Sequence, residues 1–121
     1  MTPPLAAAPA SRAGAPRVLI VFYSGYGHVA ALAAALRDGA IAAGADVTVR
    51  RFAETMSAAD AKLMQLDAPN QTVEPCTPID LATSDAIFFG FPTRFGTAPA
   101  QVQALFDETG GLWHQGQIGR A

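Results

Sequence analysis

The stretch YSGYGHVA, residues 23–30, directly follows the apolar run Val18–Phe22 and directly precedes an Ala/Leu-rich run. This order predicts a buried strand, a turn that its two glycines make possible, and then a helix. A helix start offers unpaired N–H groups and a partial positive charge, which together suit an anion. Because Ser24 adds a hydroxyl and His28 a ring nitrogen, we expect a phosphate here. An ordinary strand–helix turn, with glycines for geometry only, is the alternative.

Composition limits the other classes of function. The chain has 121 residues, enough for one domain, and half of them are apolar. A net charge of −2 provides no basic surface for nucleic acid or for anionic lipid. The lone Cys76 excludes a disulfide framework and suits a reducing compartment, so we expect a cytoplasmic protein. Two histidines and one cysteine are too few for a typical zinc centre, so no metal is expected.

The N-terminal segment differs from the rest. Residues 1–16 are rich in Ala and Pro and lack a basic leading region, so we expect a disordered extension and no signal peptide. The folded domain is expected over residues 17–121. No apolar run in the sequence approaches the roughly 20 residues that span a membrane.

Hydrophobic periodicity predicts alternating strands and helices. The expected strands are residues 17–23, 46–52 and 86–91. The expected helices are residues 28–43, closed by Gly44; 57–66, capped by Ser57; one starting at 77–78; and 98–109, closed by Gly110 and Gly111. Residues 68–78 and 92–97 are expected to be loops.

This alternation predicts right-handed crossovers and an open parallel α/β sheet. In such sheets, ligands bind beyond the carboxyl ends of the strands. The first and third strands both end in loops that contain glycine, hydroxyl and aromatic groups. The two loops lie side by side if the third strand pairs with the first.

Three blocks in fixed order resemble the WrbA-type NAD(P)H:quinone oxidoreductases, which are FMN enzymes with a flavodoxin-like fold. The blocks are Tyr23–His28, Phe91–Gly96 and Asp107–Trp113, and the segment Phe52–Met56 is more loosely similar. The likeness runs from about Arg17 to the last residue. It implies a flavodoxin-like sheet of about three strands with flanking helices.

The resemblance also implies roles for particular residues. An FMN phosphate loop is implied at Ser24, Gly25, Tyr26, Gly27, His28 and Val29, and a loop along the flavin ring at Thr93, Arg94 and Phe95. Tyr26 matches the family's NAD(P)H contact, and Trp113 its substrate-pocket aromatic. No side chain is implied as a catalytic acid or base. The family's assembly, a homotetramer, is the expected oligomer.

Two departures from the family stand out. Gly25 stands where the family more often has a larger side chain. The likeness ends where the family continues with two more strands and a third flavin loop, so we expect a domain truncated before its fourth strand. The third strand would then be an exposed apolar edge.

Other interpretations stay open for several residues. Gly25-x-Gly27-x-x-Ala30 also fits a dinucleotide motif, but Arg50 and Arg51 stand where an acid would bind the ribose, so NAD is disfavoured and an NADP-type site survives weakly. Core or interface packing is the alternative for Trp113, and a backbone hydrogen bond is the alternative for His28.

Solvent-exposed or inert roles are expected for some polar residues. Cys76 is expected to be a spectator thiol, His114 an idle surface residue, and Arg50 and Arg51 a solvated strand end. Asp107 and Glu108 point to different helix faces and make a poor acid/base pair.

The function expected from these features is FMN-dependent reduction of a quinone by NAD(P)H, as a two-electron step without nucleic acid or membrane anchor. A flavodoxin-like electron carrier, an FMN-binding module without turnover and an inactive remnant of the family are the alternatives.

Overall fold

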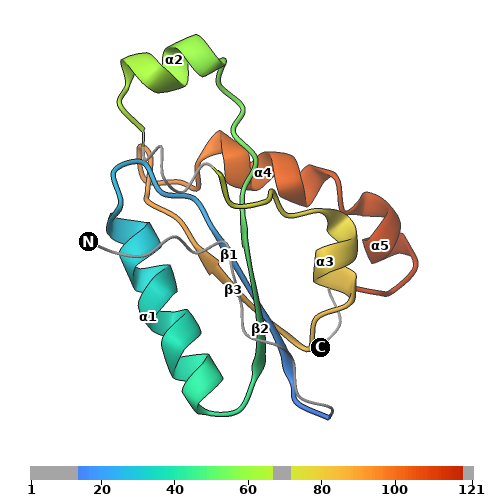
Figure 1. Cartoon of the computed structure of the whole chain (residues 1–121). Coiled ribbons are helices and arrows are strands. Elements are labelled where there is room, and N and C mark those ends of the chain that lie inside the picture. The colour runs from blue at the N-terminus through green and yellow to red at the C-terminus, as the bar shows by residue number, and fades with distance from the viewer. Residues whose placement is uncertain (1–13, 67–71, 119–121) are drawn as a thin grey trace.

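The computed structural model describes residues 14–66 and 72–118, and its elements follow the expected alternation (Figure 1). The strands are β1 (Arg17–Phe22), β2 (Asp46–Arg51) and β3 (Ala86–Gly90); the helices are α1 (His28–Ala42), α2 (Ala58–Leu63), α3 (Pro78–Ala82), α4 (Ala100–Asp107) and α5 (Gly110–His114).

The three strands form one parallel sheet in the order β2-β1-β3. The register pairs Phe22 of β1 with Arg51 of β2 and with Gly90 of β3, so all three strands end at the same level. The expected fold class is confirmed: this is an open parallel sheet with flanking helices, an incomplete flavodoxin-like arrangement.

Helices cover both faces of the sheet (Figure 1). On one face, Ile20 and Phe22 pack against the small residues of α1, and on the other, Leu19 and Val21 pack against α3 and α4. Because β1 is central and covered on both faces, its side chains are apolar in succession. The residues of β1 from Leu19 to Phe22 are at most 2% exposed.

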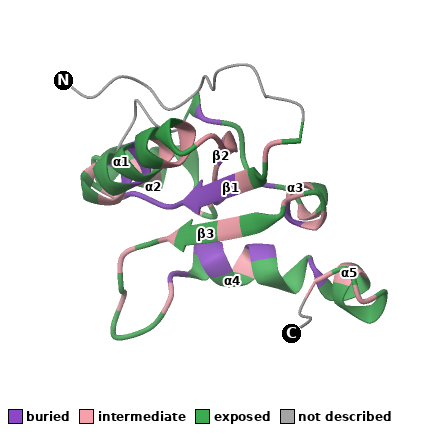
Figure 2. Cartoon of the chain, turned by 90° about the horizontal axis from the view of Figure 1, so that it is seen from below, coloured by how far each residue is buried: buried purple, intermediate pink, exposed green. Residues whose placement is uncertain are grey.

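The apolar strand β3 lies at the edge of this sheet, and Figure 2 colours most of it as exposed. Within the described residues it pairs only with β1. Its two aromatic side chains and that of the next residue remain accessible: Phe88 is 45% exposed, Phe89 40% and Phe91 38%. Unpaired backbone groups beside apolar side chains are a template for further strand pairing.

Two helix ends were predicted from glycines, and only one of these predictions was confirmed. Gly44 has φ +96° and closes α1 as expected. The expectation that Gly110 and Gly111 close the preceding helix was wrong, because α4 ends at Asp107 and the glycines begin α5. Neither glycine adopts a positive φ. Glycine permits a helix stop but does not impose one.

Other boundaries agree closely with the sequence pattern. Ser57 caps α2 by accepting a hydrogen bond from the backbone N–H of Asp60, at 3.1 Å, although α2 ends at Leu63 and not at Leu66. Much of the expected N-terminal extension, part of the loop at 68–78 and residues 119–121 lie outside the described residues. In the described part of the chain, every helix is too short or too polar to span a bilayer.

We predict that Phe88→Lys reduces self-association of the chain. A charge on an exposed edge strand opposes pairing with another strand, and a site this exposed should lose no more than about 1 kcal/mol of folding free energy. Sedimentation velocity at several concentrations measures the first effect and urea unfolding the second. Phe52→Lys is the contrasting variant, since Phe52 is 1% exposed and should not accept a charge. Unchanged self-association of Phe88→Lys would show that the β3 edge does not mediate self-association.

Candidate functional site

The loop after β1 has the tight geometry that its glycines predict. The backbone N–H of Tyr23 continues the sheet by donating to the carbonyl of Gly90, at 2.9 Å. Gly27 then forms the N-cap of α1 with φ +102°, a conformation that disfavours any residue with a Cβ. The N–H of Gly27 donates to Ser24 Oγ at 3.0 Å, which draws the loop together.

The N–H groups around this turn are largely unused. Among the described residues, the backbone nitrogens of Gly25, Tyr26, His28 and Val29 have no hydrogen-bond acceptor, whereas that of Gly27 is occupied by Ser24. Helix geometry leaves the first N–H groups of α1 without partners. The Ser24 hydroxyl, which is buried, accepts from Gly27 and can still donate its own proton. The loop can therefore supply several donors to one anion.

The loop after β3 is a tight two-residue hairpin turn. Arg94 and Thr97 exchange both backbone hydrogen bonds, at 2.9 and 3.1 Å. The two central residues, Phe95 and Gly96, have φ +53° and +79°, as a type I′ turn requires. Phe95 is a bulky residue in the left-handed region and its side chain is fully exposed. Strain of this kind persists where surrounding structure imposes it, often at a functional site.

The two loops enclose one pocket of about 290 Å³. Its lining, as far as the structure describes it, is mostly apolar, with one guanidinium and no carboxylate: Ser24, Gly25, Tyr26, His28, Val29, Met64, Leu66, Pro92, Thr93 and Arg94. Seven of the nine residues expected to bind the cofactor are in this lining; Gly27 and Phe95 are neighbours of it in the chain. The expectation that the loops meet is thus met by the structure.

Two residues that line the pocket from the segment after α2 were not predicted from the sequence. Met64 and Leu66 follow that helix and reach the pocket. No motif in the sequence marks them, because their place depends on how the segment after β2 folds back. A Cβ on Gly25 would lie 3.9 Å from Leu66 Cδ2, an ordinary contact, so this position has room for a side chain.

Arg94 is held beside the pocket by Tyr23. Its Nη2 donates to the Tyr23 hydroxyl at 3.2 Å, and its guanidinium lies 5.2 Å from the centroid of the Tyr23 ring. The same hydroxyl donates to Glu54 Oε1 at 2.7 Å. Gln101 Nε2, from the first turn of α4, donates to Glu54 Oε2 at 2.5 Å. Four segments thus meet in one polar cluster at the carboxyl end of the sheet, Tyr23, Glu54, Arg94 and Gln101.

The pKa values in this cluster are shifted in opposite directions. Burial raises the pKa of Tyr23 to about 12, helped by the hydrogen bond to Glu54 and by its charge, and opposed by Arg94. Burial alone would raise the pKa of Glu54, but hydrogen bonds from Tyr23, Gln101 and two backbone N–H groups outweigh it and hold that pKa below its ordinary value. Near neutral pH the phenol is therefore protonated and the carboxylate is charged.

Two relatives match most of this chain. It is 49% identical over 106 residues to an "NAD(P)H dehydrogenase (quinone)" of Cupriavidus metallidurans, and 43% identical over 104 residues to a protein of the same name from Rhizobium rhizogenes. Each match covers 84% of this chain and 51% of the relative. This chain resembles the N-terminal part of a WrbA-type quinone oxidoreductase. It spans about half the length of these relatives, and no protein-family model matches it.

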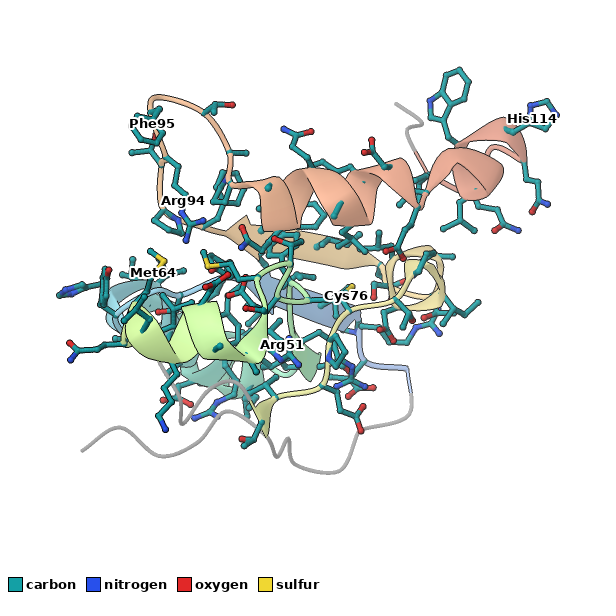
Figure 3. All side chains as sticks on the ribbon, turned by 90° about the horizontal axis from the view of Figure 1, so that it is seen from above. Arg51, Met64, Cys76, Arg94, Phe95 and His114 are labelled. Carbon is teal, nitrogen blue, oxygen red and sulfur yellow. The ribbon has the colours of Figure 1, made fainter. Side chains whose placement is uncertain are left out.

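The residues for which the resemblance implies a role do not all lie at the pocket. Tyr26 lines the pocket and is 69% exposed, which leaves its ring accessible to a second ligand. Trp113 lies on α5, is 67% exposed and does not line the pocket. Its neighbour His114 is at the far end of the molecule from Arg94 and Phe95 (Figure 3). The substrate role expected for Trp113 stays a prediction.

Two arginines differ from the solvated strand end expected for them. Arg50 lies 3.7 Å from both Glu74 and Asp80, and Arg51 Nε donates to the carbonyl oxygen of Val73 at 2.7 Å. Both are half-buried, because the chain returns past the end of β2. The bond to Val73 uses the Nε–H of the Arg51 guanidinium and fixes this side chain against the segment after β2.

The remaining candidates carry no second site. His28 is exposed, and its side chain makes no hydrogen bond to a described residue. Across residues 14–66 and 72–118, no three His, Cys, Asp or Glu side chains are grouped as metal ligands. Cys76 is buried, and burial foremost, followed by the charge of Asp80, raises the pKa of its thiol to about 12.

We predict that Phe95→Gly stabilises the fold by about 1 kcal/mol, because glycine adopts φ +53° without a steric penalty. Urea unfolding measures the change. Trp113→Gly removes another exposed aromatic residue, but from a helix, and should destabilise by about 1 kcal/mol. A loss of stability in Phe95→Gly would show that the turn holds no strain.

We predict that the Cys76 thiol resists modification in the folded chain. The thiolate is the reactive form, and a pKa of about 12 leaves almost none of it at pH 8. Reaction with a chromogenic disulfide reagent should be at least about a hundredfold slower than in urea, where the pKa returns to about 8.5. Equal rates in the two states would contradict this protection.

Proposed function

We propose that this chain binds FMN at the pocket, as part of a WrbA-type NAD(P)H:quinone oxidoreductase. The phosphate would lie in the loop from Ser24 to Val29 and the ring along Thr93 to Phe95. The observation that carries the proposal is the convergence of these two loops on one pocket. Among its described residues the pocket has unused N–H donors, one guanidinium and no carboxylate. The names of the two relatives support the reaction class.

The residues fit a phosphate monoester well. Such a group accepts several hydrogen bonds, and the N–H groups of Gly25, Tyr26, His28 and Val29 with the Ser24 hydroxyl can donate them. The positive end of α1 and the Arg94 charge favour an anion over a neutral ligand. No carboxylate among the described lining residues opposes it.

The volume of the pocket suits one end of the FMN molecule. Pockets for small ligands usually enclose roughly 300–1,000 Å³, and the 290 Å³ here is at or below that range. We infer that these residues enclose the phosphate and ribityl chain. The flat ring would then extend along the rim, where the exposed Phe95 offers an aromatic surface for offset stacking.

When bound, FMN supplies the redox chemistry, a hydride accepted from NAD(P)H and two electrons passed to a quinone. The residues of the chain would bind and orient: the first loop fixes the phosphate, Thr93 and Arg94 border the ring, and Met64 and Leu66 exclude water from one side. Tyr26 would contact NAD(P)H, since its ring is exposed at the rim. No side chain needs to act as a general base.

The role proposed for Trp113 in binding the quinone requires a second copy of the chain. Trp113 is exposed and outside the pocket, so it could meet a quinone there only from another molecule. We therefore propose a homo-oligomer, a tetramer by resemblance, in which Trp113 of one copy approaches the ring bound to the next.

We predict that FMN added to the purified chain is bound with quenching of its fluorescence, and that Gly27→Ala weakens this binding up to about tenfold. A Cβ at φ +102° costs roughly 1–2 kcal/mol and displaces the loop donors. Gly39→Ala is the matched control: Gly39 lies in α1, its added Cβ meets nothing within 4 Å, and FMN binding should stay as in the wild type. Absence of quenching in the wild-type chain would refute the proposal.

Turnover is tested separately on the same preparation. NAD(P)H should bleach the bound flavin and a quinone should restore its absorbance. Binding with no bleaching would limit the proposal to a flavin-binding module.

A further inference from the structure

Glu54 joins segments that are far apart in the sequence. Its carboxylate accepts hydrogen bonds from Tyr23, 31 residues earlier, and from Gln101, 47 residues later. It also accepts from the backbone N–H groups of Thr55 and Met56, at 2.9 and 3.3 Å. These four donors close the loop after β2 onto the end of β1 and the start of α4.

The carboxylate has no ion-pair partner among the described residues. The cation of the cluster is Arg94, which reaches Glu54 only through Tyr23. Because the Tyr23 hydroxyl donates its hydrogen bond to Glu54, the lone pairs of its oxygen are available to Arg94. The carboxylate therefore determines which way the hydroxyl points, and the hydroxyl determines where the guanidinium lies.

This arrangement is unfavourable for the fold at one point. Gln101 is 1% exposed, and turning its amide nitrogen to Glu54 leaves Oε1 buried with no partner within the described residues. A buried polar atom without a hydrogen bond is destabilising, and apolar side chains of similar shape would avoid it. A half-satisfied polar cluster beside a pocket is typical of a site under functional constraint.

We propose that Glu54, held by Gln101 and acting through Tyr23, is a positioning residue that fixes the Arg94 guanidinium at the pocket. This inference rests on the proposed FMN site, because it assigns to Arg94 a fixed place beside the flavin nucleotide. Arg94 would otherwise be a long, flexible side chain on a two-residue turn. Fixing it in advance removes an ordering cost from ligand binding.

The first experiment examines the chain without ligand. The protein contains two tyrosines, so in a Tyr26→Phe background Tyr23 is the only phenol. Its pKa, measured by ultraviolet titration with circular dichroism to confirm folding at each pH, should be about 12. Glu54→Gln should lower it by at least about one unit, since the negative charge and its strong acceptor are removed. An unchanged Tyr23 pKa would overturn the link.

The second experiment asks whether Glu54 acts through Arg94. Glu54→Gln should weaken FMN binding about tenfold, because one amide oxygen cannot replace a carboxylate that accepts from both neighbours. In an Arg94→Ala background the same substitution should have no further effect. An equal loss in both backgrounds would overturn the proposal and show a merely structural role.

Two variants complete the design. Glu108→Gln is the matched control, an exposed glutamate at the end of α4 that should leave both readouts unchanged. Gln101→Leu removes the second donor without a buried unpaired oxygen, so it should keep the fold and still weaken FMN binding; wild-type affinity in this variant would count against the proposal.

The two proposals fail separately. If the wild-type chain binds no FMN, the proposed function is wrong. The Tyr23 titration then still decides whether Glu54 orients the cluster.

Discussion

The parallel pairing of β1 with a neighbour on each side is the constraint on which the rest of this molecule depends. The four residues Leu19–Phe22 are almost completely buried, and each large apolar side chain buried in this way contributes roughly 1.5–3 kcal/mol. By comparison, the exposed pair Arg17 and Asp85, 3.7 Å apart, contributes about 1 kcal/mol at most. Burial of the central strand therefore dominates, and the register it sets makes all three strands end together.

That common end explains why the polar groups gather where they do. Parallel strands require crossovers, so each strand leaves the sheet on the same side and the next helix begins there. The donors of the first loop, the hairpin of the second and the Glu54 cluster all occupy this edge. The apolar interior provides the rigidity, and the irregular segments that project from it form the candidate site.

The sequence was sufficient for the elements with strong periodicity and clear caps. The apolar run Val18–Phe22 predicts β1, and Gly44 predicts the end of α1. The alternation of strands and helices predicts that the two loops meet. The start of α5 at Gly110 could not be foreseen, because a glycine pair is compatible with both a helix stop and a helix start.

The contacts of single polar side chains were equally beyond the sequence. Tyr23, Glu54 and Gln101 are widely separated along the chain, and only the return of the segment after β2 brings them together. Glu54 did stand in a block noted for its resemblance, directly after a strand that ends at Arg51. A lone acid at the carboxyl end of a parallel strand is the signal that could have marked it.

The position of Gly25 opposite Leu66 has a consequence for the shape of the pocket. The turn depends on the positive φ of Gly27, whereas a Cβ at Gly25 would make only an ordinary contact, 3.9 Å from Leu66 Cδ2. Bulk at that single point would grow toward the segment after α2 and narrow the entrance from one side. A side chain at this position would therefore change the width of the entrance and leave the Gly27 turn in place.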